Sequence, residues 1–409
     1  MAKKIIPGIN LKAERELTVE ITKEDIENEI ENVAKIYRKR AKIKGFRPGR
    51  APLELVKATF KDEILEDARS EALKKKIWNE LEARKEEPVS EIKIVDIKEE
   101  DDKLIAVFSY EAIPTFLFPN LTEIKVEKKI KRVSDIDVEE EVDKMRKRLA
   151  KYIPVQREAE EGDYIIADYE ERINGKTVKR NKNILVHLSW GEMKPEVFEK
   201  FKGTRKGDTV TFADFIETEN GERAKIEFIY RIKEVAEEKL PEIDDEFAKR
   251  LGFENVNEMY EKIRQNLEEK YERESEDKLE WQIIDEIYNR IQFELPQSMV
   301  ENKLEFLKRS MGVKEFPEHM KDSMENLARD LVKREIILMR FAESEGLIPT
   351  EEEIEKEIGK RAQEYHMDKE KYRKELEKRG TLENIVEYLK IEKAMETLKN
   401  LVKLEVIFE

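Results

Sequence analysis

The spacing of apolar residues changes twice along this chain, and this change restricts the possible folds more than any other feature. Before about residue 112, alternating apolar and polar runs are mixed with helical runs. From Glu161 to about residue 240 the runs are short, alternating and separated by turns that contain glycine. After Pro241 nearly all apolar residues recur at helical spacing. The sequence therefore predicts a multidomain α+β fold with a mixed, a β-rich and an all-α region.

The composition adds limits on shape and chemistry. Charged residues make up 43% of the 409 residues and apolar residues 39%, which supplies helices with one buried stripe and predicts an elongated molecule with much surface. Abundant Lys and Glu without any Cys is typical of a thermophile. The lack of Cys excludes disulfides, thiolate metal sites and cysteine nucleophiles, and it fits a cytoplasmic protein. No apolar run is long enough to span a membrane, so we expect no membrane partner.

The pattern also places domain boundaries. We expect a small α+β domain over residues 1–112 and a linker over 113–149, first extended and then helical. A compact β-rich domain follows over residues 150–240, and a large helical domain over 241–409.

Local signals predict individual elements within these regions. A single helix is expected to begin at Pro52 and to continue to Trp78, because proline suits the first helical turn. Asn174-Gly175 is a hairpin turn signal. Thr350 begins a capping box, and Thr381 is expected to cap the last long helix. The alternating run 404–408 is expected to be a strand.

One short segment departs from the mixed charge of the rest. No acidic residue occurs from Asn32 to Leu53 in a chain of net charge −15. The segment carries eight cations: Lys35, Arg38, Lys39, Arg40, Lys42, Lys44, Arg47 and Arg50. Glycines and prolines make its loop both permissive and stiff, and Phe46 lies between cations without a period that would bury it. Such a loop suits docking to a surface of protein and nucleic acid, or it is a helix–helix turn with Phe46 tucked beneath it.

The octet Gly45-Phe46-Arg47-Pro48-Gly49-Arg50-Ala51-Pro52 resembles the ribosome-binding signature of the trigger factor family of bacterial chaperones. The resemblance implies docking to the large ribosomal subunit near the exit tunnel, on protein and rRNA. The residues that it implies for docking are Gly45, Phe46, Arg47, Pro48, Gly49 and Arg50, with help from Lys42 and Lys44. It also implies arm-like helices in the last domain, which together with the first form a cradle for nascent or unfolded chains.

The β-rich region resembles prolyl isomerase domains of the FK506-binding type. The matching motifs occur in the family's order: Gly162-Asp163, Asp168-Tyr169, Asn174-Gly175, Lys202-Gly203 and Lys206-Gly207-Asp208. The chain departs from the family at Val178–Asn181 and at Lys194–Phe198, and the loop between Phe212 and Phe228 looks shortened. A remnant of the isomerase pocket would be lined by Tyr164, Asp168, Tyr169, Trp190, Phe198 and Phe228. We therefore expect weak or absent isomerase activity, with a structural or secondary client-contacting role as the alternative.

In the helical region, methionine is the main candidate for client contact. Eight of the eleven Met residues lie beyond residue 240, and flexible Met side chains suit surfaces that accept many apolar sequences. Met311, Met320 and Met324 are the residues chosen on this basis, with ordinary core packing as the alternative.

No other chemistry is indicated by the sequence. His187, His319 and His366 lack the spacing of metal ligands, and Asn174–Thr177 ends like a phosphate loop but has Glu170 where the earlier glycine belongs. We expect no metal, cofactor or ATP. The favoured function is an ATP-independent chaperone that holds nascent or unfolded polypeptides and assists folding and export, with ribosomal proteins as basic clients of an acidic cradle. The alternatives are a prolyl isomerase and an assembly scaffold for folded partners.

Overall fold

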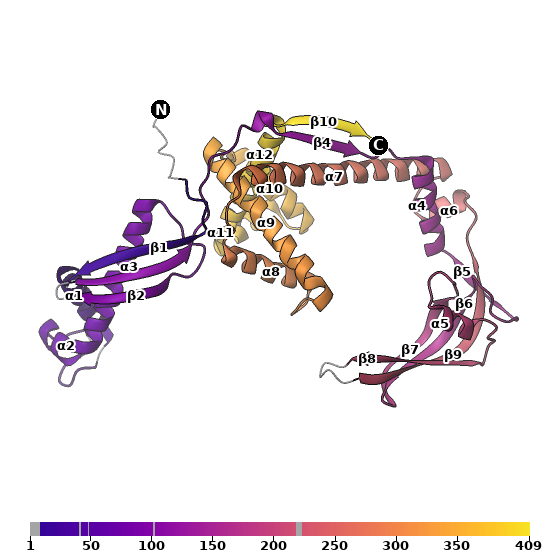
Figure 1. Ribbon diagram of the computed structural model, residues 1–409, viewed down its shortest axis with the longest axis horizontal. Helices are drawn as coiled ribbons and strands as arrows, with labels where there is room; N and C mark the ends of the chain where they lie inside the picture. The colour runs from indigo at the N-terminus through magenta and orange to yellow at the C-terminus, as the bar shows by residue number, and fades with distance from the viewer. Residues whose placement is uncertain (1–8, 41, 48, 101–102, 218–222) are drawn as a thin grey trace. The chain divides into compact units, whose positions relative to one another are not determined.

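The structure is a computed structural model that describes residues 9–40, 42–47, 49–100, 103–217 and 223–409. It contains helices and several separate sheets, which confirms the predicted multidomain α+β class (Figure 1). Contacts divide the chain into two compact units. One comprises residues 1–129 and 275–407, and the other residues 130–274 and 408–409.

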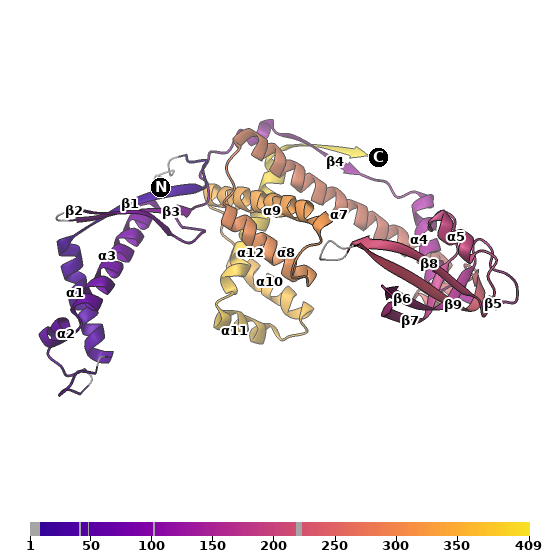
Figure 2. The ribbon, with the colours of Figure 1, turned by 60° about the horizontal axis from the view of Figure 1, so that its bottom comes forward.

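The first unit begins with a three-stranded antiparallel sheet in the order β1-β3-β2. Its strands are β1 (Glu14–Thr22), β2 (Lys93–Glu100) and β3 (Lys103–Glu111). Alternate residues of β1 are buried, because one face of the sheet packs against α3 (Lys61–Arg84). Helix α1 (Lys23–Arg40) lies beside α3, and the loop that follows it is at the end of the helices away from the sheet (Figure 2).

The single helix predicted from Pro52 to Trp78 is wrong. The structure has α2 (Leu53–Thr59) and α3, separated at Phe60, whose backbone is not helical (φ −120°, ψ 40°). The Phe60 ring lies 5.6 Å from that of Tyr37 on α1. Packing of this ring against α1 accompanies the break, which the apolar spacing did not reveal.

The rest of the first unit is a helical core. Its helices are the last part of α7 (Val256–Ile291), α8 (Gln297–Met311), α9 (Glu318–Glu345), α10 (Glu351–Glu364), α11 (Lys369–Arg379) and α12 (Leu382–Leu401). Apolar stripes of α7 and α9 form much of this core, with Ile283 and Ile336 fully buried. The Thr350 capping box is confirmed. The predicted Thr381 cap is wrong, because its side chain accepts no hydrogen bond from the start of α12.

A two-stranded ribbon, β4 (Lys125–Ile130) and β10 (Lys403–Phe408), flanks these helices, and the 3₁₀ turn η1 (Leu121–Glu123) precedes it. Its strands point in the same direction (Figure 1). The predicted strand at 404–408 is therefore confirmed.

The second unit has two cores. One joins α4 (Asp135–Arg148), α6 (Asp245–Arg250) and the first part of α7. The other is a five-stranded sheet in the order β5-β9-β6-β7, with β8 also paired to β9, and with α5 (Pro195–Phe201) against it. The strands are β5 (Lys151–Val155), β6 (Tyr164–Ile173), β7 (Lys176–His187), β8 (Thr209–Glu217) and β9 (Arg223–Lys239). Asn174 and Gly175 have φ of 48° and 81°, which confirms the predicted hairpin turn.

Candidate functional site

The loop between α1 and α2 is held in shape by its own backbone. The Gly49 N–H donates to the Arg38 carbonyl at 2.9 Å and so ties the loop back to α1. The N–H of Phe46 donates to the carbonyl of Ile43 at 3.1 Å. Gly45 and Gly49 have φ of +92° and +84°, and an added Cβ would meet nothing within 4 Å at either position. Both glycines are therefore required by backbone conformation and not by a lack of space.

The loop is anchored by aliphatic side chains and not by its aromatic residue. Ala51 is buried, and Ile43 packs against the same core as Val33 and Val56. Phe46 remains 42% exposed and belongs to none of the cores. The arrangement leaves a large ring at the surface among cations, instead of tucking it beneath the loop.

Most cations at the end of α1 and in the loop after it lack the carboxylate partner that many cations elsewhere in the protein have. Lys35 on α1 pairs with Glu31 at 3.7 Å, in the usual i,i+4 manner. Among the described residues, no ion pair engages the other cations of the segment: Arg38, Lys39, Arg40, Lys42, Lys44, Arg47 and Arg50. Elsewhere, even exposed cations such as Arg69 and Lys74 contact carboxylates within 3 Å. The loop therefore presents uncompensated positive charge in an acidic protein.

Of the predicted docking residues, Pro48 lies outside the described part of the chain. The structure brings the others together in one loop, where Lys42, Lys44, Gly45, Phe46, Arg47 and Arg50 are exposed and Gly49 is half-buried.

A cavity of about 670 Å³ beside the loop was not predicted. It lies between α1 and α3 and is lined in part by Ile36, Arg40, Lys42 and Phe60, of which Ile36 is exposed. The Tyr37 hydroxyl, also at this cavity, donates to Asp67 at 2.8 Å, and this hydrogen bond raises the pKa of Tyr37. The available signal was Ile36 itself, an apolar residue outside the buried stripe of α1 and inside its basic run.

The predicted remnant of an isomerase pocket is only partly assembled. Tyr169 stacks on Phe228 with ring centroids 6.5 Å apart, and Trp190 meets Phe198 edge to face at 5.0 Å. Tyr169 also contacts Tyr230, and burial together with a hydrogen bond to Glu171 raises its pKa. Tyr169, Phe228 and Tyr230 thus form one aromatic group on the neighbouring strands β6 and β9.

Two other residues predicted for this pocket have different neighbours. The Asp168 carboxylate lies 2.9 Å from Lys233 and accepts from the Asn183 N–H, and the hydrogen bond from Lys233 lowers its pKa. Tyr164 stacks on His187 at 4.5 Å. His187 in turn contacts Glu192 at 2.8 Å.

The three methionines chosen for client contact are not equivalent. Met311 at the end of α8 is 47% exposed, whereas Met320 and Met324 on α9 are half-buried. Sequence reasoning missed Phe306 on α8, which is 60% exposed, and Leu327 on α9. These two apolar side chains lie outside the buried faces of their helices, and this became visible only from the packing of α8 against α9.

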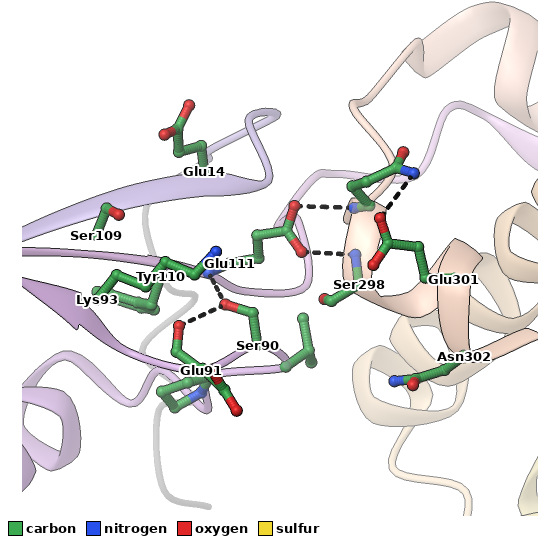
Figure 3. Close-up of a pocket in the computed structure, with 13 residues that line it drawn as sticks. Glu14, Ser90, Glu91, Lys93, Ser109, Tyr110, Glu111, Ser298, Glu301 and Asn302 are labelled. Atoms are coloured by element: carbon green, nitrogen blue, oxygen red, sulfur yellow. Dashed lines mark hydrogen bonds between the residues drawn. The ribbon is translucent and has the colours of Figure 1, made fainter.

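Another cavity, of about 900 Å³, lies where β3 meets the start of α8 (Figure 3). The Glu111 carboxylate accepts the N–H groups of Gln297 and Ser298 at 2.9 and 2.8 Å and so caps the helix. Burial raises the pKa of Glu111, but these bonds to Ser298 and Gln297 lower it more, so the net shift is downward. Glu14, Glu91 and Glu301 also line the cavity. Even so, within the described ranges no group of three or more His, Asp or Glu side chains is placed to hold a metal ion.

Among the described residues, no helix is both long and apolar enough to cross a bilayer.

Comparison with known proteins gives consistent results along the chain. The N-terminal model of "Bacterial trigger factor protein (TF)" matches residues 9–145, and the C-terminal model of the same protein matches residues 255–400. The trigger factor of Aquifex aeolicus (strain VF5) is 28% identical over 406 residues, covering 95% of this chain and 85% of the relative. That of Desulforudis audaxviator (strain MP104C) is 28% identical over 415 residues, covering 94% and 93%.

A solved structure of a trigger factor chaperone, described for promiscuous substrate recognition in folding and assembly, covers 96% of this chain and 98% of its own. Its sequence identity is 20% and the TM-score is 0.47. The family assignment rests on the sequence matches over residues 9–145 and 255–400, which together span more than half of the chain. The chain belongs to the trigger factor family of bacterial ribosome-associated chaperones.

Proposed function

We propose that this chain docks to the large ribosomal subunit beside the exit tunnel through the loop after α1, and holds emerging polypeptides on its helical part. One observation carries the docking proposal: exposed Phe46 lies among cations that no described carboxylate neutralises. The proposal keeps the predicted division into residues 1–112, 113–149, 150–240 and 241–409, and a cytoplasmic location, where ribosomes and nascent chains are found.

The chemistry of the loop fits a surface made of RNA and protein. Arg47 and Arg50 can each donate two parallel hydrogen bonds to a phosphate, and Lys42 and Lys44 add point charges. Phe46 offers an apolar ring for a pocket on a ribosomal protein. Because Gly49 ties the loop to α1, little conformational freedom is lost on docking.

Ribosome co-sedimentation tests this proposal. The variant Phe46→Ala, Arg47→Ala, Arg50→Ala should lose most of its ribosome binding, at least about tenfold in affinity, because each lost phosphate contact weakens an electrostatic interface. The matched control is Leu55→Ala, Arg69→Ala, Arg84→Ala. It also removes one exposed apolar side chain and two arginines from the same domain, but these arginines have partners. Equal binding by the first variant and the wild type would refute docking through the loop.

Client holding is supported by apolar side chains that the helical part leaves exposed. Phe306 and Met311 on α8 and Leu327 on α9 are exposed, although the same helices also bury residues in the core. Tyr365 and Met367, after α10, form a second exposed group. Adaptable side chains of this kind bind many apolar sequences without requiring one geometry. Basic clients such as ribosomal proteins would add charge attraction to a chain of net charge −15.

Prolyl isomerisation remains the alternative, favoured by the aromatic contacts of Tyr169 with Phe228 and Tyr230. An isomerase must enclose the imide in an apolar pocket that favours the twisted transition state. Because Asp168 and Tyr164 have other neighbours, we expect the activity to be weak. The measurement is refolding limited by proline isomerisation, with Phe228→Ala compared with wild type. Equal and slow refolding rates with wild type and with Phe228→Ala would agree with a chaperone. A fast rate with wild type that is largely lost in Phe228→Ala would make isomerisation the main activity.

A further inference from the structure

Three arginines of the β-rich sheet share a single carboxylate. Glu170 on β6 is only 2% exposed and accepts hydrogen bonds from Arg172 Nε at 2.8 Å and from Arg180 Nη2 at 3.3 Å. Its other oxygen accepts a hydrogen bond from Arg231 Nη2 at 3.2 Å. Three positive charges therefore gather around one negative charge.

The register of the strands places further cations on the same face of the sheet. Asp168, two residues before Glu170 on β6, lies opposite Arg231 of β9. Residues two apart on a strand share a face, so both carboxylates and Arg231 lie on one surface. Lys233 contacts Asp168 at 2.9 Å, and this hydrogen bond, with a smaller contribution from the charge of Lys182, lowers the pKa of Asp168. We call this surface the arginine face, and its cations are Arg172, Arg180, Lys182, Arg231 and Lys233.

The arginine face carries more positive charge than its carboxylates neutralise. Its five cations lie beside the two carboxylates of Asp168 and Glu170. Glu227, the next carboxylate along β9 on this face, is paired with Lys225 at 2.6 Å and so does not reduce the excess. No acidic residue occurs from Asn174 to Gly191, a range that includes all of β7. A chain of net charge −15 thus has a second basic surface.

The guanidinium groups of this face have donors to spare. A guanidinium has five N–H donors, and each of these groups uses one nitrogen on Glu170. Within the described residues, no other hydrogen bond engages the guanidiniums of Arg172, Arg180 and Arg231. The side chains of Arg180 and Arg231 are 70% and 54% exposed. Because like charges repel at this short separation, a second anion at this surface would stabilise the cluster.

Protection of the sheet edge does not account for these arginines. Strand β7 is the edge strand in the order β5-β9-β6-β7, and lysines on an edge commonly prevent pairing with another strand. Two register shifts between β6 and β7 already disrupt such pairing. Arg172 on β6 and Arg231 on β9 lie on interior strands, where no edge needs protection. Their convergence with Arg180 therefore points to a ligand.

We propose that the arginine face binds the phosphate backbone of RNA. Guanidinium groups donate paired hydrogen bonds to phosphate oxygens, and one phosphate has enough oxygens to contact arginines of neighbouring strands. The backbone repeats this charge, so Lys182 and Lys233 can contact adjacent phosphates. An extended acidic peptide fits less well, because only its alternate side chains would face the sheet. The choice of RNA rests on the proposed function, which brings the chain to the ribosome.

Binding of a fluorescent uridine oligonucleotide of about 20 nucleotides to the full chain, measured by anisotropy, tests the proposal. Every protein in the test carries Phe46→Ala, Arg47→Ala, Arg50→Ala, so that the loop after α1 contributes little. In this background, Arg180→Gln, Lys182→Gln should weaken binding at least about fivefold near 50 mM salt. The slope of log affinity against log salt should become shallower by about 1.4 units, about 0.7 for each of two lost phosphate contacts.

The matched control is Lys194→Gln, Arg205→Gln in the same background. It also removes one exposed lysine and one exposed arginine from the β-rich region, but their partners Asp214 and Glu158 lie outside the arginine face. The control should bind RNA as tightly as the background protein. Absence of oligonucleotide binding by the background protein, or equal affinities of the variant and the control, overturns the proposal.

A second variant separates a loss of charge from a loss of fold. In Arg180→Gln, Glu170 keeps its bonds at 2.8 Å from Thr177 and Arg172, so the thermal midpoint should stay close to that of the background protein. The exchange Arg180→Lys, Lys182→Arg keeps both charges and should keep most of the RNA affinity. An affinity that falls as far in this exchange as in the glutamine variant overturns recognition by charge.

Competition with polyglutamate tests the kind of ligand. At the same concentration of charge, polyglutamate should displace the oligonucleotide much less than unlabelled RNA does. Equal displacement would assign the arginine face to acidic polypeptides and overturn the proposal. Because all these proteins lack the side chains proposed for ribosome docking, a negative result here leaves the docking proposal intact, and co-sedimentation tests that proposal separately.

Discussion

Glu170 on β6 is a buried carboxylate whose surroundings determine its charge. Its side chain is only 2% exposed and accepts hydrogen bonds from the Thr177 hydroxyl and from Arg172, both at 2.8 Å, with Arg180 and Arg231 close by. The bonds from Thr177 and then Arg172 lower its pKa from 4.5 to about 2, although burial opposes the shift. In the sequence analysis Glu170 was noted only because it occupies the position where a phosphate loop would have a glycine. The structure shows that it is a central polar contact of the β-rich sheet.

The lowered pKa makes Glu170 a source of pH-dependent stability. A carboxylate with a depressed folded pKa stabilises the fold fully above its unfolded pKa of 4.5, and this contribution is lost as the pH falls toward about 2. Glu170→Gln should therefore lower the thermal midpoint at pH 7, and the gap to wild type should narrow between pH 4.5 and 2. The control Glu199→Gln, an exposed position on α5, should show no gap. A gap for Glu170→Gln that is independent of pH contradicts this account.

At the loop after α1, the sequence was informative because chemistry and backbone conformation are local there. The run of cations and the two glycines predicted a stiff, exposed turn, and the positive φ at Gly45 and Gly49 agrees with it. The cavity lined by Ile36 was not predictable, since it depends on how α3 packs beside α1. The roles of the loop residues themselves remain predictions.

Helices were predictable from sequence where they bury a stripe, and not where they are held by charge. Helix α11 was missed because it has no buried residue. It is held by ion pairs of Arg373 with Glu351 and Glu355 on α10. Helix α7 contributes to two separate cores, because Leu279 to Ile287 lie in one and Met259 to Leu267 in another. The charged residues between these groups interrupt the stripe but not the helix.

The start of α8 gives a prediction at the scale of an element, because its cap comes from a distant strand. Glu111→Ala removes the acceptor of the Gln297 and Ser298 N–H groups, which should cost about 1 kcal/mol and speed hydrogen exchange of these amides about fivefold. The matched control is Glu14→Ala, which lines the same cavity without bonding to α8 (Figure 3). Because the pKa of Glu111 is lowered, the cap should persist at pH 7 and be lost as the pH falls below 4.5. Equal exchange in both variants would show that α8 does not depend on Glu111.

At the scale of the whole molecule, the distribution of charge separates the surface proposed for ribosome docking from the surface proposed for client contact. The net charge is −15, yet the loop after α1 is positive and its cations are unneutralised within the described chain. General attraction to nucleic acid is therefore disfavoured, and any contact with RNA must be made locally. The proposed client contact, in contrast, uses exposed uncharged side chains such as Phe306, Met311 and Leu327. One protein thus combines an electrostatic surface with an apolar one.

These two surfaces should respond differently to salt. Ribosome affinity should fall about tenfold or more between 50 and 200 mM salt, because phosphate contacts release counterions. For the loop variant that lacks Arg47 and Arg50, the slope of log affinity against log salt should be shallower by about one to two units. Suppression of aggregation of an unfolded client, measured by light scattering, should change little over the same range, because apolar burial is not screened.

Substitutions on α8 and α9 test whether the exposed apolar side chains hold clients. Phe306→Ala, Met311→Ala, Leu327→Ala should weaken the suppression of aggregation at every salt concentration and leave ribosome affinity unchanged. The control Glu305→Ala, Arg309→Ala, Glu325→Ala alters exposed polar positions of α8 and α9 and should leave both activities intact. If suppression of aggregation instead fell with salt in parallel with ribosome binding, clients would be held by charge, and the acidic surface would replace the apolar one as the client site.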